Sequence, residues 1–322
     1  MMLSLLHLDP LTYRPHPLHD PRRSFPETNC YADILIELVH ARGDEPLAML
    51  GGTIRTDFEG DQWTFFKPAP HDLERLFGVD IHEMQLYRPL PDQIRGQLRA
   101  GRTVIVELDS WYLPDTKSTS YRREHVKSSA AIEGIDVDSE RLRYFHNSGL
   151  YELSGEDYRG ALRLEPRDGD DDGDASLPPY LELVRFDAGE RLTGNALRDA
   201  SRALFHDHFD SRPAVNPFAQ FGYSLTDDLP SLLDSDHAYY HVYAFATVRM
   251  AGSAFEACAS HVDWLFGPAG REAVHALETV VAGTKALSFK LARRRPFDVE
   301  AACNPLAAAW HEAVTALSKL VP

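Results

Sequence analysis

The sequence has few cysteines and no long uninterrupted hydrophobic run. Its three cysteines, Cys30, Cys258 and Cys303, are odd in number and widely spaced, which excludes a disulfide framework and a cysteine-rich zinc site. No stretch approaches the roughly 20 apolar residues that a membrane-spanning helix needs. A short apolar run at the N-terminus is interrupted by Asp9 and Pro10 before a signal peptide can form. These absences predict a cytoplasmic protein in a reducing compartment.

Basic residues are scarce relative to acidic ones. The chain has 33 Lys and Arg against 49 Asp and Glu, a formal net charge of −16. Such a molecule repels phosphate backbones and anionic membrane surfaces. We therefore expect neither a nucleic acid nor a membrane among its partners.

The length and composition indicate two domains, and the fold class predicted for the chain as a whole is α+β. With 322 residues and 43% hydrophobic content, the chain can form more than one core. We predict an α+β domain over residues 1–166, an acidic linker or loop over 167–179, and a mainly helical domain over 180–322. The run Asp168 to Asp174 cannot bury its charge, and it lacks the Glu that would complete an EF-hand calcium loop.

The first half alternates helix and strand patterns after an extended arm over residues 1–29. Apolar spacing predicts a helix beginning at Cys30, and β-branched content predicts a buried strand over 103–109. A hairpin is expected next, with arms at 125–135 and 141–147 and a five-residue turn over 136–140. The remaining predictions are a strand at 63–67, helices at 71–77 and 89–99, a closing strand near 150–153, a helix from Ser154, and C-terminal helices at 194–205, 239–266, 270–291 and 299–320.

A cysteine and a histidine are placed for nucleophilic catalysis. A helix N-terminus and a nearby imidazolium both stabilise a thiolate, so Cys30 is the candidate nucleophile and His125, at the start of the hairpin, its base. A third group must orient the imidazole. The five-residue turn places Asn147 opposite Ser129, on the same face of the sheet as His125. A turn one residue shorter or longer would point Asn147 to the other face, and His146 or Asp136 would then be the weaker candidates for orienting the imidazole.

Other residues are candidates for binding the substrate. The backbone N–H of Cys30, with Asn29 or Thr28, is expected to form an oxyanion hole. Asp109 ends the buried strand and can bind a substrate amine. Trp111 and Tyr112 follow it, and together with Trp63 they are expected to form the walls of a dry acceptor pocket.

Each assignment has a structural alternative. A single cysteine near a helix start is commonly a small buried residue, and Cys258 and Cys303 are expected to pack in helical cores. His206 and His208 are two residues apart and do not share a helix face, so we predict surface or capping roles there and no metal site. The basic segment 285–295 is either a solvated helix end or a dock for an anionic partner, with these candidate residues: Lys285, Lys290, Arg293 and Arg294.

The order of several short motifs resembles a known family. These motifs are Asn29-Cys30-Tyr31, then Asp109 to Pro114, then His125 followed by Ile132 to Asp136, then Phe145-His146-Asn147. They resemble the N-terminal domain of butirosin-biosynthesis-protein-H-like acyltransferases and, more closely, the bacterial domain-of-unknown-function family 1839. The resemblance implies a papain-like cysteine peptidase fold with Cys30 as nucleophile and His125 as base. Asn147 stands where many related cysteine peptidases have Asp.

The resemblance also implies the reaction. We expect a thioester-dependent acyl or aminoacyl transferase that takes its acyl group from the 4'-phosphopantetheine of a carrier protein, with no cofactor bound to the enzyme itself. The alternatives are an amidase or peptidase that uses the same residues with water, and a non-catalytic carrier-binding module in which Cys30 is inert.

Overall fold

The computed structural model describes residues 1–164 and 178–321. The chain divides into two compact units, and each unit is built from three separate stretches of the sequence. The first contains residues 1–17, 30–46 and 73–191, and the second contains residues 18–29, 47–72 and 192–322. The described part of the chain has no helix that combines the length and the apolar content needed to cross a membrane.

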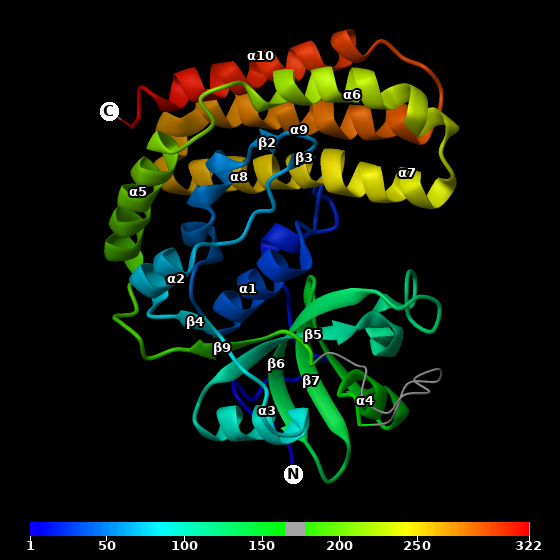
Figure 1. The fold of residues 1–322 in the computed structure, drawn as a ribbon. Coiled ribbons are helices and arrows are strands. Elements are labelled where there is room, and N and C mark those ends of the chain that lie inside the picture. Colours follow the sequence, from blue (N-terminus) through cyan, green and yellow to red (C-terminus); the bar gives the residue numbers. More distant parts are fainter. Residues whose placement is uncertain (165–177, 322) are drawn as a thin grey trace. The chain divides into compact units, whose positions relative to one another are not determined.

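An antiparallel sheet forms the centre of the first unit (Figure 1). Its spatial order is β4-β9-β5-β6-β7-β8, and β1 pairs with the far end of β6. The expected α+β class with an antiparallel sheet is confirmed. The strands are β1 (Leu3–Ser4), β4 (Asp80–Glu83), β5 (Thr103–Asp109), β6 (Lys127–Asp136), β7 (Arg141–His146), β8 (Gly149–Ser154) and β9 (Leu181–Arg185).

Helices cover both faces of this sheet. Alternate residues of a strand point to opposite faces, and on one face Val104, Val106 and Leu108 pack against α3 (Leu90–Arg99) and α4 (Glu156–Ala161). On the other face α1 (Cys30–Ala41) packs on β6 and β7 (Figure 1). Both Val104 and Val106 are fully buried, and burial of such a side chain contributes about 1.5–3 kcal/mol. The sheet is therefore a rigid support for residues at its edge.

The hairpin of β6 and β7 differs from the prediction in two ways. Asp136 pairs with Arg141, so the turn contains four residues, 137–140, and not five. A β-bulge at Glu133 then shifts the register by one, which restores the predicted register beyond it, with Ala131 paired to Phe145. The second arm also ends at His146, because the chain turns at residues 147–148 into β8.

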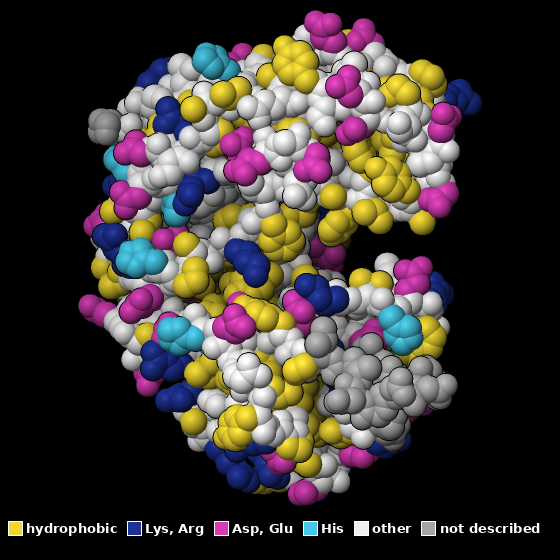
Figure 2. All heavy atoms as spheres, viewed as in Figure 1, with side chains coloured by type: hydrophobic (Ala, Val, Ile, Leu, Met, Phe, Trp, Pro, Cys, Tyr) yellow, Lys and Arg dark blue, Asp and Glu magenta, His cyan; other side chains and the backbone are white. Residues whose placement is uncertain are grey.

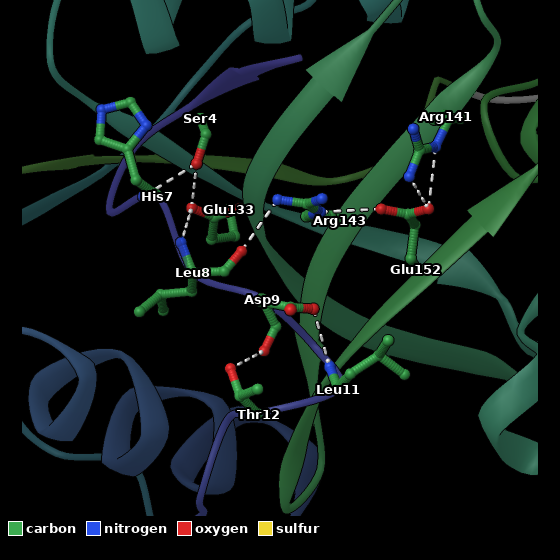
Figure 3. Close-up of polar contacts among 10 residues, drawn as sticks. All are labelled: Ser4, His7, Leu8, Asp9, Leu11, Thr12, Glu133, Arg141, Arg143 and Glu152. Carbon is green, nitrogen blue, oxygen red and sulfur yellow. Dashed lines mark hydrogen bonds and ion pairs between the residues drawn. The ribbon is translucent and has the colours of Figure 1, made fainter.

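The bulge residue anchors the N-terminal arm, as Figure 3 shows. The buried Glu133 carboxylate accepts hydrogen bonds from the Ser4 hydroxyl and from the N–H groups of Leu6 and Leu8, the last two at 3.1 and 3.4 Å. Arg143 of β7 donates to the carbonyl of Leu8 at 2.8 Å. Residues 3–4 of the predicted arm are therefore part of the sheet, as strand β1. The prediction of an extended arm that lies over the domain thus holds only in part.

The second unit is mainly helical, as expected. Its longer helices begin and end close to the predicted bounds, but α6 was missed because Pro217, Gly222 and Pro230 interrupt its pattern. A π-helical turn at Phe245–Arg249 divides the predicted helix 239–266 in two. The elements are α5 (Gly194–Asp210), α6 (Pro217–Asp234), α7 (His237–Ala244), α8 (Met250–Phe266), α9 (Arg271–Ala292), α10 (Val299–Leu317) and a hairpin of two-residue strands, β2 (Phe58–Glu59) and β3 (Gln62–Trp63). Helix α2 (Pro70–Phe77) contains the boundary between the two units, which falls after Asp72.

The predicted domain boundary at residue 180 was wrong. Strand β9 follows it in sequence, yet it pairs with β4 and β5 in the sheet of the first unit. A five-residue strand at the start of a helical segment carries no local sign of which sheet it joins. The predicted linker 167–179 falls outside the described residues except for Pro178 and Pro179.

Candidate active site

A histidine and an aspartate meet at one end of the sheet. The Nδ1 atom of His125 lies 2.7 Å from Oδ2 of Asp109. The Trp111 indole stacks on the same imidazole, with ring centroids 4.5 Å apart and planes inclined by 10°. Asp109 is 8% exposed and His125 is 55% exposed. A buried carboxylate and an aromatic ring thus hold an accessible imidazole in one orientation.

The local sequence explains this arrangement. Strand β5 ends at Asp109, whose Oδ1 caps a short 3₁₀ turn, Ser110–Tyr112, by accepting the N–H of Trp111 at 3.1 Å. The N–H of Ser110 donates to the carbonyl of Val126 at 2.9 Å, which ties the turn to the start of β6. His125 therefore lies beside the capping carboxylate.

The sheet register places this pair on the face that α1 covers. A single row across the sheet contains Glu182, Ile105, Ala131 and Phe145. Tyr31 of α1 hydrogen-bonds to Glu182, and Tyr13 links α1 to this row by donating to Glu37 while its ring packs on Phe145. Asp109 is four residues beyond Ile105 on β5 and so points to the same face.

A pocket of ≈ 400 Å³ opens beside the imidazole. An ion pair of 2.8 Å between Lys127 and Glu107 lies on its wall. Burial and a hydrogen bond to Glu182 raise the pKa of Tyr180 to about 12, so its hydroxyl is neutral at physiological pH. The lining residues are Glu107, Leu108, Asp109, His125, Val126, Lys127, Arg163, Pro178, Pro179 and Tyr180.

Cys30 is the first residue of α1 and is half-buried. It thus has the predicted position at a helix N-terminus. Within the described residues, no hydrogen bond joins its sulfur to His125. The structure places the thiol on the helix that faces the histidine's side of the sheet, without direct contact.

Comparison with protein families accounts for most of the chain. Residues 14–186 match the DUF1839 N-terminal domain, and residues 194–319 match the DUF1839 C-terminal domain. The chain belongs to the DUF1839 family. No curated protein matches it.

The register of β6 with β7 continues to place Asn147 opposite Ser129, as predicted, but Asn147 lies beyond the last pair of the ladder. It is the first residue of the turn between β7 and β8, and its φ of 45° is in the left-handed region that Asn tolerates. Of the two weaker candidates, Asp136 is at the opposite end of β6, where its carboxylate contacts the N-terminal amine at 3.1 Å. In this DUF1839 chain the carboxylate that contacts His125 is therefore Asp109, which the sequence analysis had assigned to the substrate.

The third alternative, His146, belongs to a separate buried network on the other face of the sheet. Its Nδ1 lies 2.5 Å from Asp115, and its Nε2 lies 2.6 Å from the hydroxyl of Ser128. Tyr144 donates to the second oxygen of Asp115 at 2.6 Å. Sequence reasoning missed this network because Asp115 comes from a loop that only the folded chain brings to β7.

The proposed binding residues are distributed over several places. The Asn29 side chain is buried and donates to the carbonyl of Phe66 at 2.9 Å, whereas Thr28 is half-buried. Tyr112 packs against Gly160 of α4, on the face opposite to His125. Of the three aromatic residues expected in the acceptor pocket, Trp111 stacks on the imidazole, whereas Trp63 is buried in the hydrophobic core of the second unit.

The basic segment is partly structural. Lys285 donates to the carbonyl of Ser24 at 2.9 Å, and Arg294 donates to the carbonyl of Asp236 at 3.2 Å. Lys290 and Arg293 are exposed. Two of the four residues expected to dock a partner are thus engaged within the second unit.

His208 was expected at the surface, but it is buried. Its Nε2 lies 2.6 Å from Asp72, and neither side chain is more than 10% exposed. The contact shows that one of two histidines spaced two residues apart on a helix can be buried against an aspartate that is distant in sequence. Among the described residues, no group of three or more potential metal ligands occurs.

Proposed function

We propose that this DUF1839 protein is a cysteine-dependent acyl or aminoacyl transferase. Cys30 accepts the acyl group as a thioester from the phosphopantetheine of a carrier protein, and an amine or another acceptor then receives it. The observation that supports the proposal is the 2.7 Å contact between His125 and Asp109 on the sheet face covered by α1. The motif order also resembles papain-like acyltransferases of the butirosin type.

The histidine has the properties of a general base. When its Nδ1–H donates to Asp109, the lone pair of Nε2 is available to accept a proton. No other hydrogen bond to this ring is present in the described ranges, 1–164 and 178–321. The imidazole is thus oriented on one side and open on the other, as a general base requires.

The proposed reaction has two steps. The thiol of Cys30 loses its proton to His125 and attacks the carbonyl of the carrier thioester, and the phosphopantetheine thiol leaves with that proton. An acceptor amine then attacks the enzyme thioester, His125 takes its proton, and the thiol of Cys30 is restored. Catalytic hydrogen bonds often form only with substrate bound, which accommodates the separation of Cys30 from His125.

Intact-mass spectrometry with an acylated carrier protein tests this function. Wild type is expected to gain one acyl adduct, and Cys30→Ala none. Cys303→Ala is the matched control, because it removes a thiol that is only 3% exposed and should leave the adduct intact. Equal transfer by wild type and Cys30→Ala would contradict the proposal, and release of free acid without acceptor product would favour hydrolysis.

A carrier protein would bind the exposed part of the basic segment. Carrier proteins are acidic, and Lys290 and Arg293 offer positive charge in a chain of net charge −16. Reversal of both to Glu should weaken carrier binding. Arg99→Glu combined with Arg271→Glu, two exposed changes outside the basic segment, alters the net charge by the same amount and serves as the control. Equal weakening by both double variants would exclude a local dock.

A further inference from the structure

Two exposed histidines converge at one point on the surface of α7. His237 and His241 are four residues apart, a spacing that brings side chains together on one face of a helix. Their Nε2 atoms form a 2.8 Å hydrogen bond in which one ring donates and the other accepts, and their ring planes are inclined by 78°. A metal ion bound by both nitrogens would displace the shared proton. Neighbouring hydrophobic side chains on this helix are also exposed, as Figure 2 shows over α7, including Tyr239 and Val242. The pair is thus accessible from solvent.

We propose that His237 and His241 form a transition-metal site. Two nitrogen atoms 2.8 Å apart, each about 2.0–2.1 Å from a shared ion, subtend an angle of about 86° at that ion. A tetrahedral ion would need the nitrogens about 3.3 Å apart at the same bond length. The separation therefore matches neighbouring positions in a square-planar or octahedral ion, the geometries of Cu(II) and Ni(II).

The surroundings support a site with two protein ligands. The Asp236 side chain is occupied as the helix cap, where it accepts the N–H of Tyr239 at 2.7 Å. Arg294, the nearby cation, directs its guanidinium to backbone carbonyls, including that of Asp236, and lies over the ring of Tyr240. Both of these side chains therefore already have partners within the second unit. Two imidazoles leave further coordination positions open, and water would fill them in a bound ion.

The order of metal affinities follows from these ligands. Imidazole nitrogen binds Cu(II) more tightly than Ni(II) or Zn(II), and the near-right angle adds to the preference for Cu(II) over Zn(II). The site is therefore an open, exchangeable Cu(II) site that does not depend on the acyltransfer proposal. Loss of one imidazole should weaken Cu(II) binding by about tenfold or more, since one of two coordinate bonds is removed.

The test uses the full chain with one equivalent of Cu(II). Electron paramagnetic resonance of wild type should show two equatorial imidazole nitrogens, and His241→Gln should show one at most, with weaker binding by calorimetry. His275→Gln is the matched control. His275 is exposed on α9, and the residue four positions after it is Thr279, which offers no second imidazole. Circular dichroism of the metal-free variants verifies that the helices are retained.

Two results would overturn the inference. One is unchanged Cu(II) affinity and nitrogen coordination in both His237→Gln and His241→Gln. The other is an equal loss in His275→Gln, which would assign the binding to dispersed surface histidines and not to this pair.

Discussion

Asp109 contacts His125 through one carboxylate oxygen and the backbone of Trp111 through the other, while the Trp111 ring stacks on that same imidazole. One side chain thus sets both the tautomer of the histidine and the turn that holds its stacking partner. The arrangement makes Asp109 the group on which the orientation of His125 depends most directly.

Substitution of Asp109 by Asn should reduce acyl transfer. The amide keeps the shape of the side chain but removes the charge that stabilises the imidazolium, and such losses lower the rate by about 10²–10⁴-fold. The rate of acyl transfer from carrier to acceptor measures the effect. Asp92→Asn on α3 is the control, because the ion pair of Asp92 with Arg95 is exposed and outside the pocket. An Asp109→Asn rate equal to that of Asp92→Asn would contradict this role.

Substitution of Asn147 by Gly should leave acyl transfer nearly unchanged. Its positive φ favours Gly, so the β7–β8 turn is preserved, and its side chain is not the one that contacts His125. Asn147→Ala should cost about 1 kcal/mol of unfolding free energy because Ala disfavours this conformation. A Gly variant that loses activity as severely as Asp109→Asn would restore Asn147 as the orienting residue.

The three cysteines should react very differently with iodoacetamide in the native protein. Burial raises the pKa of Cys258 to about 12 and that of Cys303 to about 11, whereas Cys30 is half-buried at a helix start. One adduct, on Cys30, is expected at mildly alkaline pH, and all three cysteines should react after denaturation. Peptide mapping identifies the sites, and native labelling of Cys258 ahead of Cys30 would be inconsistent with the structure.

Removal of Asp115 should destabilise the first unit. Asp115→Ala leaves His146 and the hydroxyl of Tyr144 buried without their acceptor, and breaking a buried pair of this kind costs about 3–5 kcal/mol. Urea unfolding measures the change. The control is Asp92→Ala, whose ion pair with Arg95 is exposed and is worth about 0–1 kcal/mol. Similar losses in both variants would show that the network contributes little.

Stability should fall in acid through His261. Burial lowers its pKa from 6.5 to about 4, so the folded chain holds it neutral while the unfolded chain protonates it. The unfolding free energy keeps the full contribution of neutral His261 above pH 6.5 and loses it as the pH falls towards 4. The pKa difference between the folded and unfolded chain corresponds to a total loss of about 3 kcal/mol.

Urea unfolding of wild type and His261→Gln across that range tests the prediction. Gln can still donate to the carbonyl of Leu47, which Nδ1 of His261 contacts at 2.7 Å. The variant should show a flatter dependence on pH than wild type. Parallel curves for the two proteins would show that His261 is not the titrating group.

The sequence by itself determined the local elements of this protein. The bounds of β5, the start of α1 at Cys30 and the long helix α9 all matched, because each is encoded by a periodic pattern of apolar residues within one segment. The candidate base, His125, and the candidate nucleophile, Cys30, were also chosen from such positions.

The tertiary structure decided which of these residues meet. The partner of His125 is Asp109 because β5 and β6 are adjacent, and the bulge at Glu133 sets the register with β7. Cross-strand pairs and bulges depend on contacts between segments that are distant in sequence, and no single segment encodes them. For the same reason β9, which directly precedes the helical segment in sequence, joined the sheet of the first unit between β4 and β5.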